Sequence, residues 1–478
     1  MDASPTPRSH GNDEDCATPP KPHVLVVPYP AQGHMLPLLD LVALLAKRGL
    51  SLTVAVTPGN APLLAPLLAS CPPLSVATVT LPFPHSSGLL PAGCGENTKD
   101  LPGHLFRPFM VSLAALRDPL LDWCNARRKR PSERVTAVVS DMFTGWTWPL
   151  AAELGVPHVT FSPSPAHYLA VSHSLWRRMP RRRHVIDDED ESVAFPDVPG
   201  SPIFPWRHLS GLFRQYVAGE EVSEAIRQFF LWNLESICFV ANTSTAIEAS
   251  YVDRPLPDLM GKKVLAVGPL SCAVERRTDR PAVAPASVGA WLDAFGDGAV
   301  LYVSFGTQVT LSPAQAARVA DALAQSAAPF MWAAGSGTAV PEGFEAATST
   351  RGMVVRGWAP QVEILRHRAV GWFLTHCGWN SVLEAVASGV AMLTWPMSAD
   401  QFTNACLLAE AGVAVPVAEG ADAMPDAGEM ADVIASAIGD GGTSARERAA
   451  ELGRSTAAAV AEGGSSYSDL EELVRMLA

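Results

Sequence analysis

Between Trp358 and Gln401 the sequence contains side chains that together could hold a nucleotide-sugar. The segment begins with an aromatic ring, has a histidine near its centre and ends with an acid and an amide. An apolar run at 370–374 predicts a strand, and the apolar spacing from Ser381 onward predicts a helix. The turn at 376–380 then lies at a helix N-terminus, where unpaired N–H groups and the helix dipole favour an anion such as a diphosphate.

The same residues also allow a structural explanation. Ser381 and Glu384 have the spacing of a capping box, in which both side chains would serve only the helix N-terminus. Taken alone, His376 could be an ordinary loop histidine and Trp358 could belong to the core. Coincidence explains the complete segment less well than it explains any one of these residues.

The segment from Trp358 to Gln401 resembles, along its whole length, the plant secondary-product glycosyltransferase signature, which is the donor-binding box of plant family 1 UDP-glycosyltransferases. The resemblance implies the α/β fold called GT-B, in which two Rossmann-like, doubly wound domains face each other across a cleft. It also implies sugar transfer from a UDP-sugar to a small acceptor. One departure is Ala391, which stands where the family usually has proline.

The resemblance implies a role for each matching residue of this segment. Trp358 would stack on the uracil ring, and the backbone of Ala359 would bind the edge of the base. Gln361 and Glu384 would bind the ribose, since an ionised carboxylate accepts hydrogen bonds from two adjacent hydroxyls. The other implied contacts are His376, Asn380 and Ser381 with the diphosphate, and Trp379, Asp400 and Gln401 with the sugar hydroxyls. In this family a closing glutamine is associated with glucose more often than with galactose, so the resemblance implies UDP-glucose as the donor.

A second histidine, His34, could supply the base for the reaction. The run at 23–28 predicts a buried strand, and His34 lies between that strand and a helix predicted over 37–48. Ligands of open α/β sheets bind outside the carboxyl ends of the strands, which is where this histidine lies. Residues 30–34, Pro-Ala-Gln-Gly-His, resemble the segment in which the family carries its catalytic histidine.

Asp141 ends another apolar run, and the resemblance implies that it orients His34. A carboxylate bonded to an imidazole fixes the tautomer and stabilises the imidazolium that proton uptake creates. A helix N-cap is the structural alternative for Asp141. The expected mechanism is proton removal by His34 and inverting attack on the anomeric carbon, with His376 and the helix N-terminus stabilising the departing UDP. No metal and no cofactor is expected, because the sequence shows no Asp-x-Asp pair or ligand cluster.

A third strand-to-turn unit reaches Gly306 and Thr307, and the resemblance implies that they lie near the phosphates or the uridine. A strand is predicted over 299–304, and Pro near the start of 313–326 predicts a helix there. Without the resemblance, the pattern indicates only a βα unit.

Strand and helix patterns alternate in both halves of the chain, which predicts doubly wound parallel sheets. Its 478 residues exceed what one hydrophobic core supports, so two domains are expected. The predicted divisions are a disordered tail (1–20), an acceptor-binding domain (21–270), a linker (271–288), a donor-binding domain (289–465) and a C-terminal helix (466–478). The resemblance implies that this last helix returns to the first domain.

Composition limits the partners of the protein. The formal net charge of −13 argues against binding to nucleic acid, which requires a basic surface. No apolar run approaches the length needed to span a bilayer, and the polar first twenty residues do not resemble a signal peptide. The eight cysteines are scattered without a paired framework, as is typical of reduced thiols in the cytosol. We therefore expect a cytoplasmic, monomeric protein that binds a UDP-sugar and a small acceptor.

The acceptor is expected to be a plant phenol such as a flavonoid, bound mainly by the first domain. Pro163 departs from many relatives, which have a threonine there that contacts the sugar, and Ser162 or Ser164 could substitute for it. Two alternatives stay open: a catalytically silent UDP-sugar-binding protein, and the same class of enzyme with another UDP-sugar.

Overall fold

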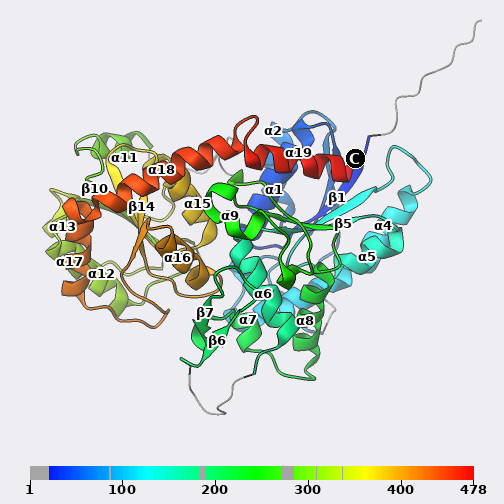
Figure 1. Ribbon diagram of the computed structural model, residues 1–478, viewed down its shortest axis with the longest axis horizontal. Helices are drawn as coiled ribbons and strands as arrows, with labels where there is room; N and C mark the ends of the chain where they lie inside the picture. Colours follow the sequence, from blue (N-terminus) through cyan, green and yellow to red (C-terminus); the bar gives the residue numbers. More distant parts are fainter. Residues whose placement is uncertain (1–20, 86–87, 182–188, 271–284, 308, 336) are drawn as a thin grey trace, which may run out of the picture.

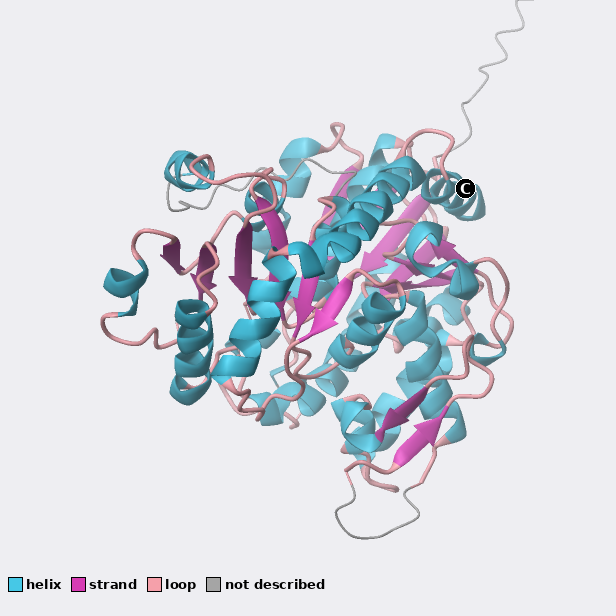
Figure 2. Cartoon of the chain, turned by 60° about the vertical axis from the view of Figure 1, so that its left-hand side comes forward, coloured by secondary structure: helices cyan, strands magenta, loops and turns pink. Residues whose placement is uncertain are grey.

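Two parallel sheets with helices on both faces form two Rossmann-like domains, as Figures 1 and 2 show. The protein therefore has the α/β, GT-B fold class predicted from the sequence. The computed structural model describes residues 21–85, 88–181, 189–270, 285–307, 309–335 and 337–478. The predicted tail over 1–20 and most of the predicted linker, 271–284, lie outside these residues.

The N-terminal sheet has seven parallel strands in the order β3-β2-β1-β4-β5-β8-β9. β1 and β4 lie side by side near its centre and are buried along their whole length. Strands covered on both faces read as continuous apolar runs, which is why the sequence indicated them clearly. The strands are β1 (His23–Val27), β2 (Ser51–Val56), β3 (Val76–Thr80), β4 (Ala137–Asp141), β5 (His158–Ser162), β8 (Cys238–Ala241) and β9 (Val264–Ala266).

Helices and one short hairpin complete the N-terminal domain. The hairpin pairs β6 (Ser192–Ala194) with β7 (Ile203–Pro205) in antiparallel fashion. The helices are α1 (Gln32–Lys47), α2 (Ala65–Ser70), α3 (Phe106–Ser112), α4 (Arg117–Arg127), α5 (Thr147–Leu154), α6 (Ala166–Arg178), α7 (Gly211–Arg214), α8 (Glu221–Asn233) and α9 (Thr245–Val252).

The C-terminal sheet has six parallel strands in the order β12-β11-β10-β13-β14-β15. Its strands are β10 (Val300–Ser304), β11 (Phe330–Ala334), β12 (Gly352–Arg356), β13 (Val370–Thr375), β14 (Ala391–Thr394) and β15 (Ala414–Pro416). Its helices are α11 (Pro285–Leu292), α12 (Pro313–Gln325), α13 (Phe344–Thr348), α14 (Gln361–Leu365), α15 (Trp379–Ala387), α16 (Gln401–Glu410), α17 (Ala427–Ile438) and α18 (Thr443–Val460). The end of the predicted linker therefore forms the first turn of α11.

The first helix differs from its prediction in a way that matters for the site. α1 begins at Gln32, ahead of the predicted start at Pro37, which instead lies inside the helix. Proline resembles a helix start in a sequence because the first turn of a helix does not need the backbone N–H that proline lacks. As a consequence, His34 belongs to the first turn of α1 and not to a loop before it.

The last helix, α19 (Ser465–Leu477), lies against the N-terminal domain, although α18 before it packs on the C-terminal domain (Figure 1). Leu470, Leu473 and Leu477 join the apolar core around β1 and β2. Asp469 accepts a hydrogen bond from the backbone N–H of Ala266 in β9 at 2.8 Å. The end of the chain thereby links the two domains.

None of the helices in the described ranges combines the length and apolar character needed to cross a lipid bilayer.

Candidate active site

His34 and Asp141 form a hydrogen-bonded pair at the carboxyl end of the first sheet. Nδ1 of His34 lies 2.9 and 3.0 Å from the two carboxylate oxygens of Asp141. Asp141 is the buried last residue of β4, whereas the His34 side chain is 19% exposed. With Nδ1 donating to the carboxylate, Nε2 of His34 carries the lone pair and can accept a proton.

The helix-capping alternative for Asp141 does not agree with this geometry. The next helix, α5, begins after its N-cap Trp146, away from Asp141. The carboxylate instead accepts the N–H of Phe143 at 2.8 Å, in the turn directly after β4. This second hydrogen bond helps to fix the carboxylate that orients the imidazole.

Aromatic rings surround the imidazole on the side of the N-terminal domain. The ring centroid of Phe143 lies 4.5 Å from that of His34, and Tyr29 packs edge-on at 5.3 Å. Phe106 packs edge-on against both Tyr29 and Phe143. The His34 imidazole therefore packs against apolar rings. Its Nδ1 is hydrogen-bonded to the Asp141 carboxylate, and its Nε2 lies on the other side of the ring.

The donor turn lies between β13 and α15, as the sequence predicted. Gly378 is the N-cap of α15 and no side chain caps the helix, so its first backbone N–H groups have no intrahelical acceptor. The capping-box alternative is wrong, because Ser381 and Glu384 lie inside the helix. Instead, Nε2 of Gln361 donates to Ser381 Oγ at 3.0 Å and to Glu384 Oε2 at 2.8 Å. The two residues predicted to bind ribose are therefore already hydrogen-bonded partners.

His376 is enclosed by two glycines, Gly378 of this turn and Gly306 of the turn after β10. A Cβ at Gly306 would lie 2.8 Å from its Cε1, and a Cβ at Gly378 would lie 2.5 Å from its Nε2. Gly306 also has a φ of 74°, a conformation that favours glycine. Burial lowers the pKa of His376 to about 4, and its buried Nδ1 has no hydrogen-bond partner within the described part of the chain. A neutral His376 would bind a diphosphate as a hydrogen-bond donor and not as a cation.

The residues predicted to contact the uracil ring lie in and around the loop between β12 and α14. Trp358 is half-buried in the loop between β12 and α14 and stacks on no aromatic ring among the described residues. The carbonyl of Ala359 accepts the N–H of Gln361 at 2.8 Å, in a tight turn directly after Trp358. Thr307 is exposed just after β10, at the edge from which Gly306 approaches His376.

Asp400 and Gln401 lie at the N-terminus of α16. Asp400 accepts a hydrogen bond from Ser164 of the other domain at 2.8 Å, and burial raises the pKa of Asp400. Oε1 of Gln401 accepts the N–H groups of Met397 and Ser398, each at 2.9 Å. The amide nitrogen of Gln401 is therefore its remaining donor for a sugar hydroxyl.

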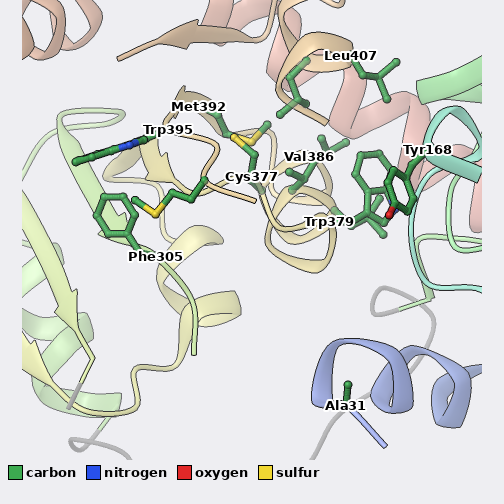
Figure 3. Packing of buried hydrophobic residues seen from close by; sticks show 14 of the residues in the cluster. Ala31, Tyr168, Phe305, Cys377, Trp379, Val386, Met392, Trp395 and Leu407 are labelled. Carbon is green, nitrogen blue, oxygen red and sulfur yellow. The ribbon is translucent and has the colours of Figure 1, made fainter. Parts of the chain in front are cut away.

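The side chain of Trp379 makes a contact that the sequence did not predict, and the predicted contact of Trp379 with the sugar stays a prediction. Its indole N–H donates to the carbonyl of Asn242 in the N-terminal domain at 2.7 Å, and its side chain is buried. Figure 3 shows Trp379 in the apolar cluster that also contains Tyr168 of α6. Because the indole has only one donor, its side chain cannot also donate to a sugar hydroxyl. Its observed contact is between the domains.

Three hydrogen bonds join the halves of the site across the domain boundary. They are Ser164 to Asp400, Trp379 to Asn242, and Asn380 Nδ2 to the carbonyl of Gly33 at 3.2 Å. Gly33 adjoins His34, so the base and the donor turn meet at one boundary. Sequence reasoning missed Gly33 and Asn242, since only their backbone oxygens take part and a backbone acceptor has no sequence signal. It also missed Asn404, which supports the donor turn by donating to the carbonyl of Cys377 at 2.9 Å.

Comparison with known proteins is consistent with this geometry. Residues 227–434 match the family described as UDP-glucuronosyl and UDP-glucosyl transferases. UDP-glycosyltransferase 89B2 of Stevia rebaudiana is 45% identical over 465 residues, covering 95% of this chain and 98% of the relative. The chain belongs to the plant family 1 UDP-glycosyltransferases.

Other relatives of this glycosyltransferase have more specific names. The flavonol 3-O-glucosyltransferase UGT89B1 of Arabidopsis thaliana is 42% identical and covers 89% of this chain and 90% of the relative. The solved structure of Arabidopsis thaliana UGT89C1 with UDP-L-rhamnose has a TM-score of 0.76 at 34% identity, covering 96% of this chain and 99% of that one. UGT89C1 has also been solved with quercetin. The described residues of this glycosyltransferase contain no group of three or more His, Cys, Asp or Glu placed to hold a metal ion.

Proposed function

We propose that this UDP-glycosyltransferase transfers glucose from UDP-glucose to a hydroxyl or carboxyl group of a plant phenol, with flavonoids as the first acceptors to test. The observation that carries the proposal is the His34–Asp141 pair at the boundary where the donor turn meets the first domain. The flavonol 3-O-glucosyltransferase at 42% identity supports this class of acceptor.

In the proposed reaction, Nε2 of His34 takes the proton from the acceptor hydroxyl as its oxygen attacks the anomeric carbon. The bond from that carbon to the UDP oxygen breaks on the opposite face, so the configuration inverts and UDP leaves with the bonding electron pair. Asp141 stabilises the imidazolium that forms. His376 and the N-terminal N–H groups of α15 donate to the leaving diphosphate and stabilise its growing charge.

The choice of glucose depends on Gln401, whose amide oxygen already accepts two backbone N–H groups, so that its amide nitrogen remains as a donor for a sugar hydroxyl. Because a relative has been solved with UDP-L-rhamnose, the experiment below compares several UDP-sugars as donors. We assign stabilisation of the diphosphate charge to hydrogen-bond donors of the protein alone, without a cofactor or metal. Turnover is therefore expected to be unchanged in excess EDTA, and a loss restored by Mg²⁺ or Mn²⁺ would contradict this part of the proposal.

The decisive experiment compares the wild type with His34→Ala and Asp141→Asn. Product formation is measured with UDP-glucose, UDP-galactose, UDP-xylose and UDP-rhamnose against flavonoid and benzoate acceptors, and UDP binding is measured by calorimetry. General base catalysis typically contributes ~10² to 10⁴-fold, so His34→Ala should lose turnover by about that factor and keep UDP binding. Asp141→Asn should also lose turnover, because an amide can stabilise the wrong imidazole tautomer.

Two results would contradict the proposal. Tight UDP binding without product across the whole panel would favour a silent UDP-sugar-binding protein. Substantial transfer by His34→Ala would remove His34 from the role of base.

A further inference from the structure

The first turn of α1 is tied to the N-terminus of α15 by a hydrogen bond across the domain boundary. Nδ2 of Asn380 donates to the carbonyl oxygen of Gly33 at 3.2 Å. Gly33 and His34 are neighbours in the same helical turn. The bond therefore connects the turn that carries the base with the helix at which the diphosphate is expected.

The Gly33 carbonyl is available to Asn380 because of Pro37. In an α-helix each carbonyl accepts the N–H of the residue four positions later, which for Gly33 is residue 37. Proline has no N–H, and its ring also crowds the carbonyl four residues earlier. Pro37 lies inside α1, so the helix itself leaves the Gly33 oxygen without its usual donor. Asn380 supplies a donor from the other domain.

A side-chain amide carries two N–H groups, which gives Asn380 a second possible contact. One N–H is directed to Gly33, and the other can donate to the diphosphate of a bound donor. A single amide would then set the position of the His34 turn relative to the leaving group. Small errors in such a distance are costly for catalysis, since rates fall steeply when reacting groups are misplaced by about 1 Å.

We propose that Pro37 is a positioning residue, which keeps the Gly33 carbonyl open for Asn380 and so holds His34 in register with the bound donor. This inference rests on the proposed function, because it assigns the benefit to transfer by His34. It also explains why an interior helix position carries a residue that is intrinsically unfavourable there.

The first test is Pro37→Ala, which supplies an N–H that can bond to Gly33 within the helix. The helix should become no less stable, because alanine is the better helix former. We expect the melting temperature to be unchanged or higher, UDP affinity to stay within about twofold, and kcat to fall by about tenfold. A purely structural proline would give the opposite combination, with lost stability or no loss of kcat. Pro119→Ala, at an exposed position in the first turn of α4, is the matched control and should leave UDP affinity and kcat unchanged.

A double-mutant cycle with Asn380→Ala separates the proposed contact from other effects of Pro37. If Pro37 acts through Asn380, Pro37→Ala should lower kcat in the wild-type background but hardly at all in the Asn380→Ala background. An equal loss of kcat in both backgrounds, or no loss in either, would overturn the proposal.

Amide hydrogen exchange gives a readout that needs no transfer reaction. Asn380→Ala should speed exchange of the amides at residues 34–36 several-fold while leaving α4 unchanged. Unchanged exchange there would refute the contact even in an active enzyme. Faster exchange in a protein without any transferase activity would keep the contact and refute the proposed function instead.

Discussion

Ser164 of the N-terminal domain donates a hydrogen bond to the carboxylate of Asp400 in the C-terminal domain, at 2.8 Å. Burial raises the pKa of Asp400, and the hydrogen bond from Ser164 acts in the opposite direction by favouring the ionised form. Ser162 directs its hydroxyl to the carbonyl of Ser164 at 2.9 Å, within its own turn. Of the two serines that flank Pro163, Ser164 is therefore the one that reaches the expected sugar site.

Replacing Ser164 by alanine should weaken sugar binding selectively. Asp400 would lose a donor that favours its ionised form, and an ionised carboxylate is the better acceptor for sugar hydroxyls. We expect the Kd of UDP-glucose to rise about fivefold, the effect of one ordinary hydrogen bond. UDP serves as the control ligand because it lacks the sugar, and its Kd should not change. Equal weakening of both ligands in calorimetry would show that Ser164 acts on the whole domain arrangement.

Trp358→Ala should weaken UDP itself. Stacking of a base on an aromatic side chain typically contributes about 1 to 3 kcal/mol, so the Kd of UDP should rise by a factor of about 5 to about 150. Trp123→Ala is a suitable control, because Trp123 is also a half-buried tryptophan but lies on α4 beside Arg127, in the other domain. Similar losses of UDP affinity in both variants would contradict a stacking role for Trp358.

The sequence predicted regular elements well and contacts between distant residues poorly. β13 was expected over 370–374 and spans Val370–Thr375, because a buried parallel strand is a bounded apolar run. The start of α1 was misplaced because Pro37 resembles a helix start, and the contact that accommodates it comes from another domain. Trp379 and Asn242 are 137 positions apart, and no local pattern encodes an indole donating to a distant carbonyl.

His376 should take up protons when UDP binds in mildly acidic solution. Burial holds its pKa at about 4 in the free protein, so the imidazole is neutral at about pH 5.5. A nearby diphosphate favours the protonated form and raises that pKa, and binding then takes up protons below about pH 6.5 but not near pH 8. Calorimetry in buffers of different ionisation enthalpy measures this uptake.

The control for this prediction is His376→Gln, which keeps a hydrogen-bond donor but cannot titrate. UDP has its own phosphate ionisation, which contributes equally to both proteins. Proton uptake by the wild type should exceed that of His376→Gln at about pH 5.5, and the difference should vanish near pH 8. Equal uptake by both proteins at the lower pH would place the diphosphate away from this imidazole.

A buried carboxyl group, Glu248, supports the turn that carries Ser164. Its two oxygens accept the N–H groups of Ala166 and His167, at 2.9 and 2.8 Å. These are the first residues of α6, whose N-cap Pro165 has no side chain able to cap the helix. Burial raises the pKa of Glu248 to about 7. The carboxyl group therefore titrates in the folded protein near neutral pH.

Because the pKa of Glu248 differs between the folded and unfolded states, the free energy of unfolding should change with pH in a definite direction. Between the ordinary pKa of 4.5 and the folded value of about 7, the folded protein holds a proton that the unfolded chain lacks. Stability from this group is therefore greatest at low pH, falls as pH rises from about 5 to about 7, and is constant above that range. The total change should be at most about 3.5 kcal/mol, since the pKa is raised from 4.5 to about 7 and one pKa unit corresponds to about 1.4 kcal/mol.

The contribution of Glu248 can be isolated by urea unfolding. The free energy of unfolding is measured for the wild type and for Glu248→Gln from about pH 5 to about pH 8, and the two are compared. Buried histidines such as His158 and His173 have lowered pKa values, so they destabilise the fold as pH falls below about 6.5. Both proteins contain them, and their contribution cancels in the difference. The wild type should lose stability relative to Glu248→Gln as pH rises to about 7, because the glutamine amide does not titrate. A difference that stays constant over this range would mean that the folded Glu248 carboxyl group is already ionised at pH 5, with its charge held by the N-terminus of α6.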